Sequence, residues 1–99
     1  MSANFLDKQP SEVFTIDVNY LARLAVGETV ISKIVIVTEV LTGSDVTTAI
    51  VKISAIITPK VYITLQGGTD GMDYKITVKA TTNSNNVLEE EVIMHVREE

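Results

Sequence analysis

A glycine-rich stretch, GGTDG at positions 67–71, has the residue types of a ligand-binding loop. In a phosphate-binding loop the glycines lead into a helix N-terminus, and a lysine and a hydroxyl residue follow, so that amides and an ammonium meet the anion. Here the alternating run YKITVKA follows, which is typical of a strand, and Asp70 would repel phosphate. We therefore interpret the stretch as a turn and predict no bound cofactor.

Three aspartates and the single histidine are the remaining candidates for metal binding or catalysis. Asp45, Asp70 and Asp73 carry the oxygen ligands that calcium prefers, but their spacing is not that of an EF-hand loop, and we expect Asp70 to cap the turn. His95 alternates out of phase with its apolar neighbours, which predicts an exposed residue on a strand. One histidine cannot supply a metal site within a monomer, and no serine sits in a nucleophile turn. The sequence predicts no metal site and no enzyme.

The elements that hold these residues are predicted to be strands. Val, Ile and Thr make up more than a third of the 99 residues, and branching at Cβ favours a pleated sheet over a helix. The length suits one domain with a single core. There is no cysteine, so no disulfide can support that core. The sequence therefore predicts one all-β domain that is stabilised by packing alone.

The charge balance limits the partners that this domain can bind. The formal net charge is −5, and the lysines and arginines are scattered singly, so nucleic acid would be repelled. The longest aliphatic run, Ile34 to Val37, is far too short to span a membrane, and the first residues lack the apolar run of a signal peptide. We expect a soluble protein made in the cytoplasm, with neither a nucleic acid nor a membrane as its partner.

The first ten residues have no sustained period and are predicted to form an N-terminal arm, ahead of a domain over residues 11–99. Chain ends are usually mobile unless they are tied down, so the arm is expected to be loosely ordered. The alternative is an arm that docks on a neighbouring subunit through Phe5 and Leu6. Pro10 ends the arm because proline cannot donate a ladder hydrogen bond.

The next segments predict a strand and then a short helical turn. Residues 12–18 alternate, with Phe14, Ile16 and Val18 on the inner face. Residues 19–26 break the alternation and place leucines at helical spacing, which suits one turn that folds under an end of the domain as a plug.

Residues 29–41 form the longest strand-like run, and both of its faces are apolar at one place, IVIV. One face belongs to the core, and the other must be covered by the chain itself or by another subunit. The candidate interface residues are therefore Phe5 and Leu6 in the arm and Ile34, Val35, Ile36 and Val37 in this strand.

The remaining strands complete a sandwich pattern. Residues 47–57 predict one strand that switches sheets or two short strands, with Val51, Ile53, Ala55 and Ile57 inward. Strands follow at 61–65, at 74–80 and at 87–97, and the last two form a hairpin around an asparagine-rich turn. About seven antiparallel strands with one short helical turn in roughly a hundred residues are typical of an immunoglobulin-like β-sandwich.

The segment DGMDYKI at positions 70–76 resembles the tyrosine corner of immunoglobulin-like domains. In that motif an aspartate lies four residues before a tyrosine, here Tyr74, and a core residue follows two positions later. Ile76 occupies the place of the second cysteine of antibody domains. The resemblance implies that the Tyr74 hydroxyl bonds to the backbone a few residues upstream. The structural corner is expected to consist of Gly67, Gly68, Asp70, Gly71, Tyr74 and Ile76.

Over positions 8–97 the chain also resembles the small immunoglobulin-like fibre-tail adaptors of the head–tail modules of phages and prophages. The matching features are the hydrophobic residue before GGTDG, the YKITV strand with the threonines after it, and the opening KQPSEVFTIDVNYLARLAVGETV. An aromatic of the family pattern is replaced by Val18.

The resemblance implies a non-enzymatic structural or assembly protein of the virion, in its tail or head–tail region. Such a protein would act through contacts with other virion proteins or with copies of itself, as a homo-oligomer. It is expected in the virion, or in the bacterial cytoplasm before assembly. The alternative interpretation is an immunoglobulin-like adhesion or carbohydrate-binding module of the cell surface, and the lack of a secretory signal and of exposed aromatic platforms argues against it.

Overall fold

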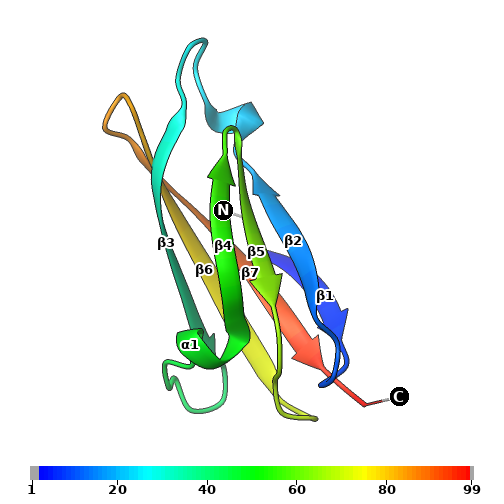
Figure 1. Ribbon diagram of the computed structural model, residues 1–99. Coiled ribbons are helices and arrows are strands. Elements are labelled where there is room, and N and C mark those ends of the chain that lie inside the picture. Colours follow the sequence, from blue (N-terminus) through cyan, green and yellow to red (C-terminus); the bar gives the residue numbers. More distant parts are fainter. Residues whose placement is uncertain (1–2, 99) are drawn as a thin grey trace.

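The computed structural model describes residues 3–98, with side chains from Phe5 onward. It contains seven strands and two short helices (Figure 1). The strands are β1 (Ala3–Lys8), β2 (Phe14–Asn19), β3 (Val30–Glu39), β4 (Val51–Ile57), β5 (Lys60–Leu65), β6 (Asp73–Thr82) and β7 (Val87–Val96). The part of the predicted arm that comprises Met1 and Ser2 lies outside the described residues.

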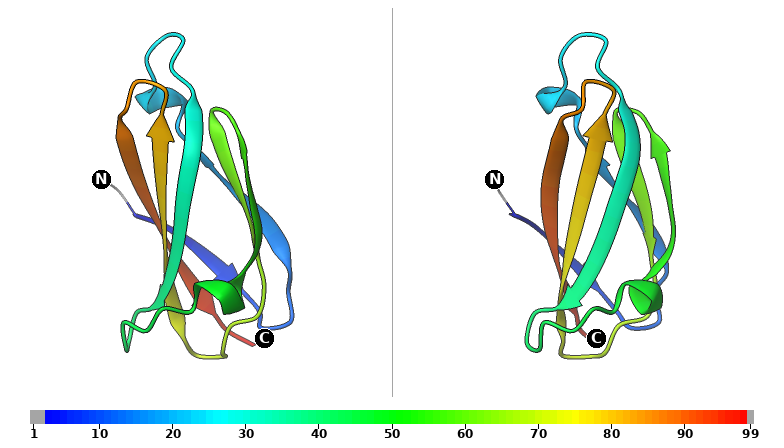
Figure 2. Two further views of the ribbon diagram at one scale, coloured as in Figure 1. Left: turned by 60° about the vertical axis from the view of Figure 1, so that its left-hand side comes forward. Right: turned by 90° about the vertical axis from the view of Figure 1, so that its left-hand side faces the viewer.

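The strands form two sheets that pack face to face (Figure 2). The first sheet has the order β1-β7-β6-β3, and the second has the order β2-β5-β4. This arrangement confirms the predicted all-β sandwich, and its strand order is immunoglobulin-like with the first strand beside the last. All paired strands are antiparallel except β1 and β7, which run parallel. The expectation of a wholly antiparallel sandwich is therefore wrong for one pair.

Residues 3–8 form a strand, so the prediction of a loosely ordered arm is wrong for them. Their sequence has little alternation, but pairing with β7 relies on backbone groups, which every residue carries. Phe5 points outward with 69% of its surface exposed, Leu6 packs against the core, and Lys8 is buried. The segment therefore belongs to the sandwich.

The centre of the core comes from strands β5 and β6, as their alternation predicts. The residues predicted to face inward there are all buried, namely Val61, Ile63, Leu65, Tyr74, Ile76, Val78 and Ala80. They pack against Val37 of β3 and Met94 of β7, which are also fully buried. The sequence pattern thus located the core correctly in these two strands.

The short helix η1 (Leu21–Arg23) follows β2 at the place of the predicted helical turn. The plug at this end of the sandwich is Tyr20, which is fully buried and donates a hydrogen bond of 2.8 Å to the carbonyl of Val78. The predicted plug was the leucines, but Leu21 is 63% exposed and only Leu24 packs against the core. A phenol reaches further into the gap between the sheets than leucine does, and its hydroxyl finds a partner there.

A second helix, α1 (Thr47–Ile50), replaces the start of the strand predicted over residues 47–57. A β-bulge between Val51 and Ile53 then shifts the pairing of β4 with β5. Because a one-residue shift turns every side chain to the opposite face, Ile53 and Ile57 point to solvent, 63% and 65% exposed. Their predicted inward orientation is wrong, as is that of Ala55, which is also exposed. Within residues 3–98, no helix is long and apolar enough to cross a membrane.

Candidate assembly interface

The loop between β5 and β6 connects the two sheets. The backbone N–H of Thr69 donates a hydrogen bond of 2.9 Å to the hydroxyl of Tyr74, five residues further on. Gly68 has a φ of +99°, and a Cβ there would lie 2.8 Å from a methyl carbon of Val96. Ile76, at the position of the antibody cysteine, is fully buried. The loop thus needs glycine where it passes β7.

The same loop holds the C-terminal end of β7. The Asp70 side chain accepts a hydrogen bond of 2.8 Å from the backbone N–H of Glu98, just after β7. The N–H of Gly71 donates to the carbonyl of Val96 at 2.9 Å. Asp70 therefore caps the end of the last strand, and the GGTDG stretch leads into strand β6.

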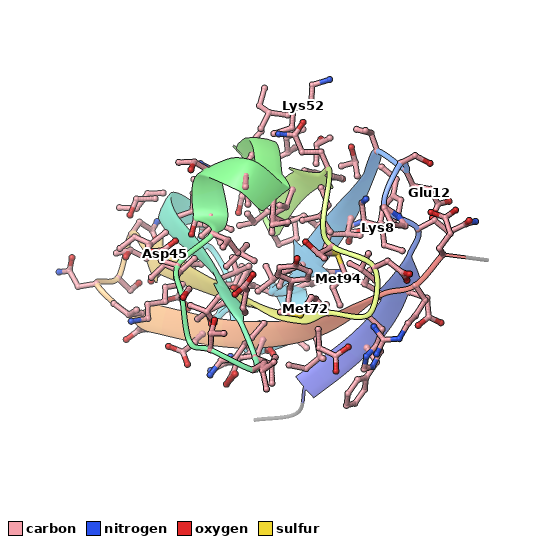
Figure 3. The ribbon with its side chains drawn as sticks, turned by 90° about the horizontal axis from the view of Figure 1, so that it is seen from below. Lys8, Glu12, Asp45, Lys52, Met72 and Met94 are labelled. Atoms are coloured by element: carbon pink, nitrogen blue, oxygen red, sulfur yellow. The ribbon has the colours of Figure 1, made fainter. Side chains whose placement is uncertain are left out.

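Lys8 connects the end of β1 to this loop, and the sequence analysis did not predict this role. Its side chain is buried, and the ammonium donates to the carbonyls of Gln9, Pro10 and Gly67 at 2.8, 3.3 and 2.6 Å. Figure 3 shows it beside Glu12 at this end of the sandwich. Burial lowers the pKa of Lys8, and the charge of Glu12 partly offsets that effect. A lysine in an irregular segment is normally read as solvent-exposed, so no pattern could reveal this role.

Phe5 belongs to a cluster of side chains on the outer face of the four-stranded sheet. The Phe5 ring stacks on the imidazole of His95, with ring centroids 5.8 Å apart and planes within 2°. The Asp73 carboxylate lies 2.9 Å from Nδ1 of His95 and accepts a hydrogen bond of 2.9 Å from Arg97. Hydrogen bonds from His95 and Arg97 hold the pKa of Asp73 below its usual value. We call these four residues the Phe5 cluster.

The predicted interface on β3 separates into two faces. Val37 is fully buried and Val35 packs against the core, so neither is available to a partner. Ile34 is 57% exposed and Ile36 is partly exposed, both on the outer face of the four-stranded sheet. Likewise Leu6 faces inward while Phe5 faces outward. The structure thus brings Phe5, Ile34 and Ile36 onto one face and turns the other three predicted residues inward.

Ion pairs lie in the middle of this face, between an apolar strip at Phe5 and an apolar strip at Ile34 and Ile36. On β6 and β7, Lys75 pairs with Glu91 at 3.2 Å and Lys79 pairs with Glu89 at 3.8 Å. Lys79 is also the register neighbour of Ile34 on β3. The outer face therefore has an apolar strip along each side and a charged strip of both signs in between.

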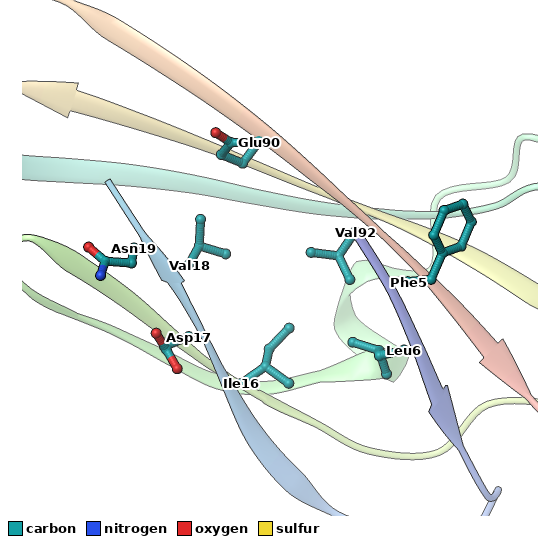
Figure 4. Close-up of a pocket in the computed structure, with 8 residues that line it drawn as sticks. All are labelled: Phe5, Leu6, Ile16, Asp17, Val18, Asn19, Glu90 and Val92. Atoms are coloured by element: carbon teal, nitrogen blue, oxygen red, sulfur yellow. The ribbon is translucent and has the colours of Figure 1, made fainter. Parts of the chain in front are cut away.

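A groove of about 400 Å³ opens on the side of the sandwich between β2 and the β1–β7 pair. Figure 4 shows Leu6, Ile16, Val18 and Val92 converging on it. Asp17 and Glu90 also line it. It is a shallow hollow with a mixed apolar and acidic lining, and the sequence pattern did not reveal it.

The three aspartates considered as calcium ligands accept hydrogen bonds from other groups of the protein. Asp45 accepts two hydrogen bonds from Thr47, while Asp70 and Asp73 make the contacts described above. Across residues 3–98, no group of three or more acidic or histidine side chains is placed to hold a metal ion.

Comparison with known proteins identifies the family. A search of curated proteins gives no match. The family model described as "Podophage GP4 fiber-tail adaptor protein gp77" matches residues 8–95, which span β2 to β7 almost completely. This match confirms the resemblance to fibre-tail adaptors, and it supports a structural role in a phage over a cell-surface module. The chain belongs to the podophage GP4 fiber-tail adaptor protein gp77 family.

Proposed function

We propose that this protein joins fibre and tail components of a virion by direct protein–protein contacts, after its synthesis in the bacterial cytoplasm. The observation that carries the proposal is the match of a fibre-tail adaptor family to residues 8–95. The shape of the molecule is compatible with it, because the described surface offers sheet faces and a shallow groove for contact with other proteins.

The outer face of the four-stranded sheet is the surface that we assign to a neighbouring virion protein. It presents Phe5 beside Ile93 at one side and Ile34 with Ile36 at the other. Protein interfaces combine an apolar centre with a polar rim and are enriched in aromatic residues. The complementary partner is therefore a protein surface with apolar side chains spaced to fit the two strips and polar groups facing the ion pairs between them.

Phe5 is the strongest contact residue on this face. It exposes 69% of its surface, and its ring is oriented by stacking on His95. An aromatic side chain that is held in place before binding loses little conformational entropy when a partner covers it. Phe5 is thus suited to be an anchor of the interface.

Nucleic acid is not among the partners that we propose. The net charge is −5, and the two lysines in the middle of the outer face are already paired with glutamates. A duplex approaching this face would meet the carboxylates of these pairs, which oppose its binding.

The test compares Phe5→Ala with Leu41→Ala, which removes a more exposed side chain (82%) from the loop after β3. Each variant replaces the parent during phage growth, and the adaptor and fibre content of purified virions is measured. We expect Phe5→Ala to reduce the fibre content and Leu41→Ala to leave it unchanged.

Thermal unfolding of both purified variants controls for folding. Normal fibre content with Phe5→Ala combined with Ile34→Ser would exclude this face as the contact surface. Deletion of residues 1–9 is a poorer test, because it would also remove β1 and the buried Lys8.

A further inference from the structure

Strand β4 has an open edge. It pairs with β5 on one side, and on its other side the described residues supply no strand. Along β5, the backbone N–H and C=O groups of successive residues point alternately toward β4 and toward β2. The hydrogen bonds from Gln66 N to Ile50 O and from Tyr20 N to Pro59 O show which residues point to which side. The same alternation along β4 directs the N–H and C=O groups of Ser54 and Ile56 out of the open edge.

Parts of the β3, β7 and β2 edges are protected. The β3 edge is closed near both ends by threonine hydroxyls that accept hydrogen bonds from the N–H groups of Val30 and Val37, at 3.1 and 2.9 Å. Beyond the start of β1, the β7 edge is closed by Arg23, which donates to the carbonyl of Glu89 at 3.0 Å. The exposed face of β2 carries the charge of Asp17. Natural proteins use such devices to prevent strand addition, and β4 lacks them between positions 53 and 57.

The exposed face of β4 is apolar and symmetric in sequence. Ile53 and Ile57 are 63% and 65% exposed, with the exposed Ala55 midway between them. Reversing the direction of the strand about Ala55 therefore places isoleucine on isoleucine and alanine on alanine. Such self-complementarity is what a two-fold interface between identical chains requires.

We propose that β4 pairs antiparallel with β4 of a second copy, with the two-fold axis at Ala55. In this register Ser54 exchanges backbone hydrogen bonds with Ile56 of the second copy, and the reverse pair does the same. Ile53 lies beside Ile57 of the second copy, so the exposed isoleucines cover one another. The three-stranded sheets of the two copies then form one continuous sheet of twice the width.

Charge is compatible with this pairing. Two lysines adjoin the paired segment, Lys52 at the bulged end of β4 and Lys60 opposite Ile57 on β5, where it pairs with Asp17 at 3.8 Å. The two-fold axis places the two copies of Lys52 at opposite ends of the interface. The net charge of −5 on each copy opposes association, so salt should strengthen the pairing. This inference does not depend on the proposed fibre-tail function.

Disulfide trapping tests the pairing, because the chain contains no cysteine of its own. At the proposed axis the two Ala55 residues form a non-hydrogen-bonded pair with Cα atoms about 4.5 Å apart, within the range of about 4.4–6.8 Å for a disulfide. Purified Ala55→Cys should form a covalent dimer in a glutathione redox buffer. The matched control is Ile34→Cys, at an exposed position of another strand (57%). We expect on the order of tenfold more dimer with Ala55→Cys. Equal trapping of the two variants would overturn the proposal.

A second pair of variants tests the register. Ile53→Cys and ¹⁵N-labelled Ile57→Cys should form a mixed dimer of intermediate mass when they are combined. Each variant alone should give little dimer, because its two thiols would lie about four residues apart along the strands, roughly 13 Å. Self-dimers without the mixed dimer would contradict a two-fold axis at Ala55.

Discussion

The Lys8 ammonium donates a hydrogen bond of 2.6 Å to the carbonyl oxygen of Gly67, fifty-nine positions further along the chain. This contact joins the end of the first strand to the loop that links β5 with β6. It explains how a segment with little strand pattern is held in the sandwich. The buried Lys8 ammonium donates hydrogen bonds to three carbonyl oxygens, and one of them belongs to the loop between β5 and β6.

Lys8→Met should therefore destabilise the fold. Methionine has a similar length, but it leaves buried carbonyls without a donor, at a cost of about 1–3 kcal/mol in the free energy of unfolding. Urea denaturation measures the change. The exposed Lys52, which projects from the surface in Figure 3, gives the control Lys52→Met, for which we expect a change within about 0.5 kcal/mol. Equal effects of the two substitutions would show that the Lys8 hydrogen bonds contribute nothing.

Tyr74→Phe should lower stability without altering the fold. It removes the acceptor of the Thr69 N–H, and the loss of one such hydrogen bond typically costs about 1 kcal/mol. The measurement is the urea midpoint, with circular dichroism to confirm an unchanged sandwich. Identical midpoints for the variant and the parent would argue against a stabilising corner.

The buried Tyr20 predicts a loss of stability at alkaline pH. Burial, with the nearby charge of Glu90, raises its pKa from 10.0 to about 12. The unfolded chain therefore releases this proton first, so the stabilisation is complete below about pH 10 and is lost as the pH rises through the folded value of about 12.

Tyr20→Phe should show a weaker decline between pH 10 and 12 in the denaturant midpoint, and its absorbance titration should lack the step at about pH 12. At neutral pH the same variant should lose about 1 kcal/mol, because the Val78 carbonyl loses its donor. Parallel pH profiles for the parent and the variant would contradict the assignment.

Two glycines of the corner separate backbone strain from steric overlap. Gly68 and Gly71 have φ values of +99° and +87°, so alanine is strained at either position, by roughly 1–2 kcal/mol. A Cβ at Gly71 meets no atom within 4 Å, whereas one at Gly68 meets Val96 at 2.8 Å. Gly68→Ala should thus lower the melting temperature more than Gly71→Ala. The opposite order would mean that β7 moves aside freely.

Strands that bury only one of their two faces could be predicted from the sequence. In β5 and β6 every second residue enters the core, so alternation in the sequence maps directly onto alternation in burial. The same logic failed in β4, where a helix and a bulge shift the phase by one residue. A bulge leaves no composition signal, so Ile53 and Ile57 read as core residues.

The candidate interface was only partly predictable for a related reason. The run IVIV indicates two apolar faces, but only the sheet order shows which residues face the opposite sheet and which face solvent. The sequence predicts Phe5 as a contact residue, but its position on a strand depends on backbone pairing with β7. Lys8 and Tyr20 were missed because their roles depend on carbonyl groups that are distant in sequence.

The parallel pairing of β1 with β7 determines how the molecule bears tension. The register runs from Ala3 opposite Glu91 to Lys8 opposite Val96, so the chain enters β1 and leaves β7 at opposite ends of the pair. A pull between the two ends of the chain then acts along both strands. The hydrogen bonds of the pair must shear together, whereas a pulled hairpin opens them one after another. The first strand thus serves as a mechanical clamp on the last.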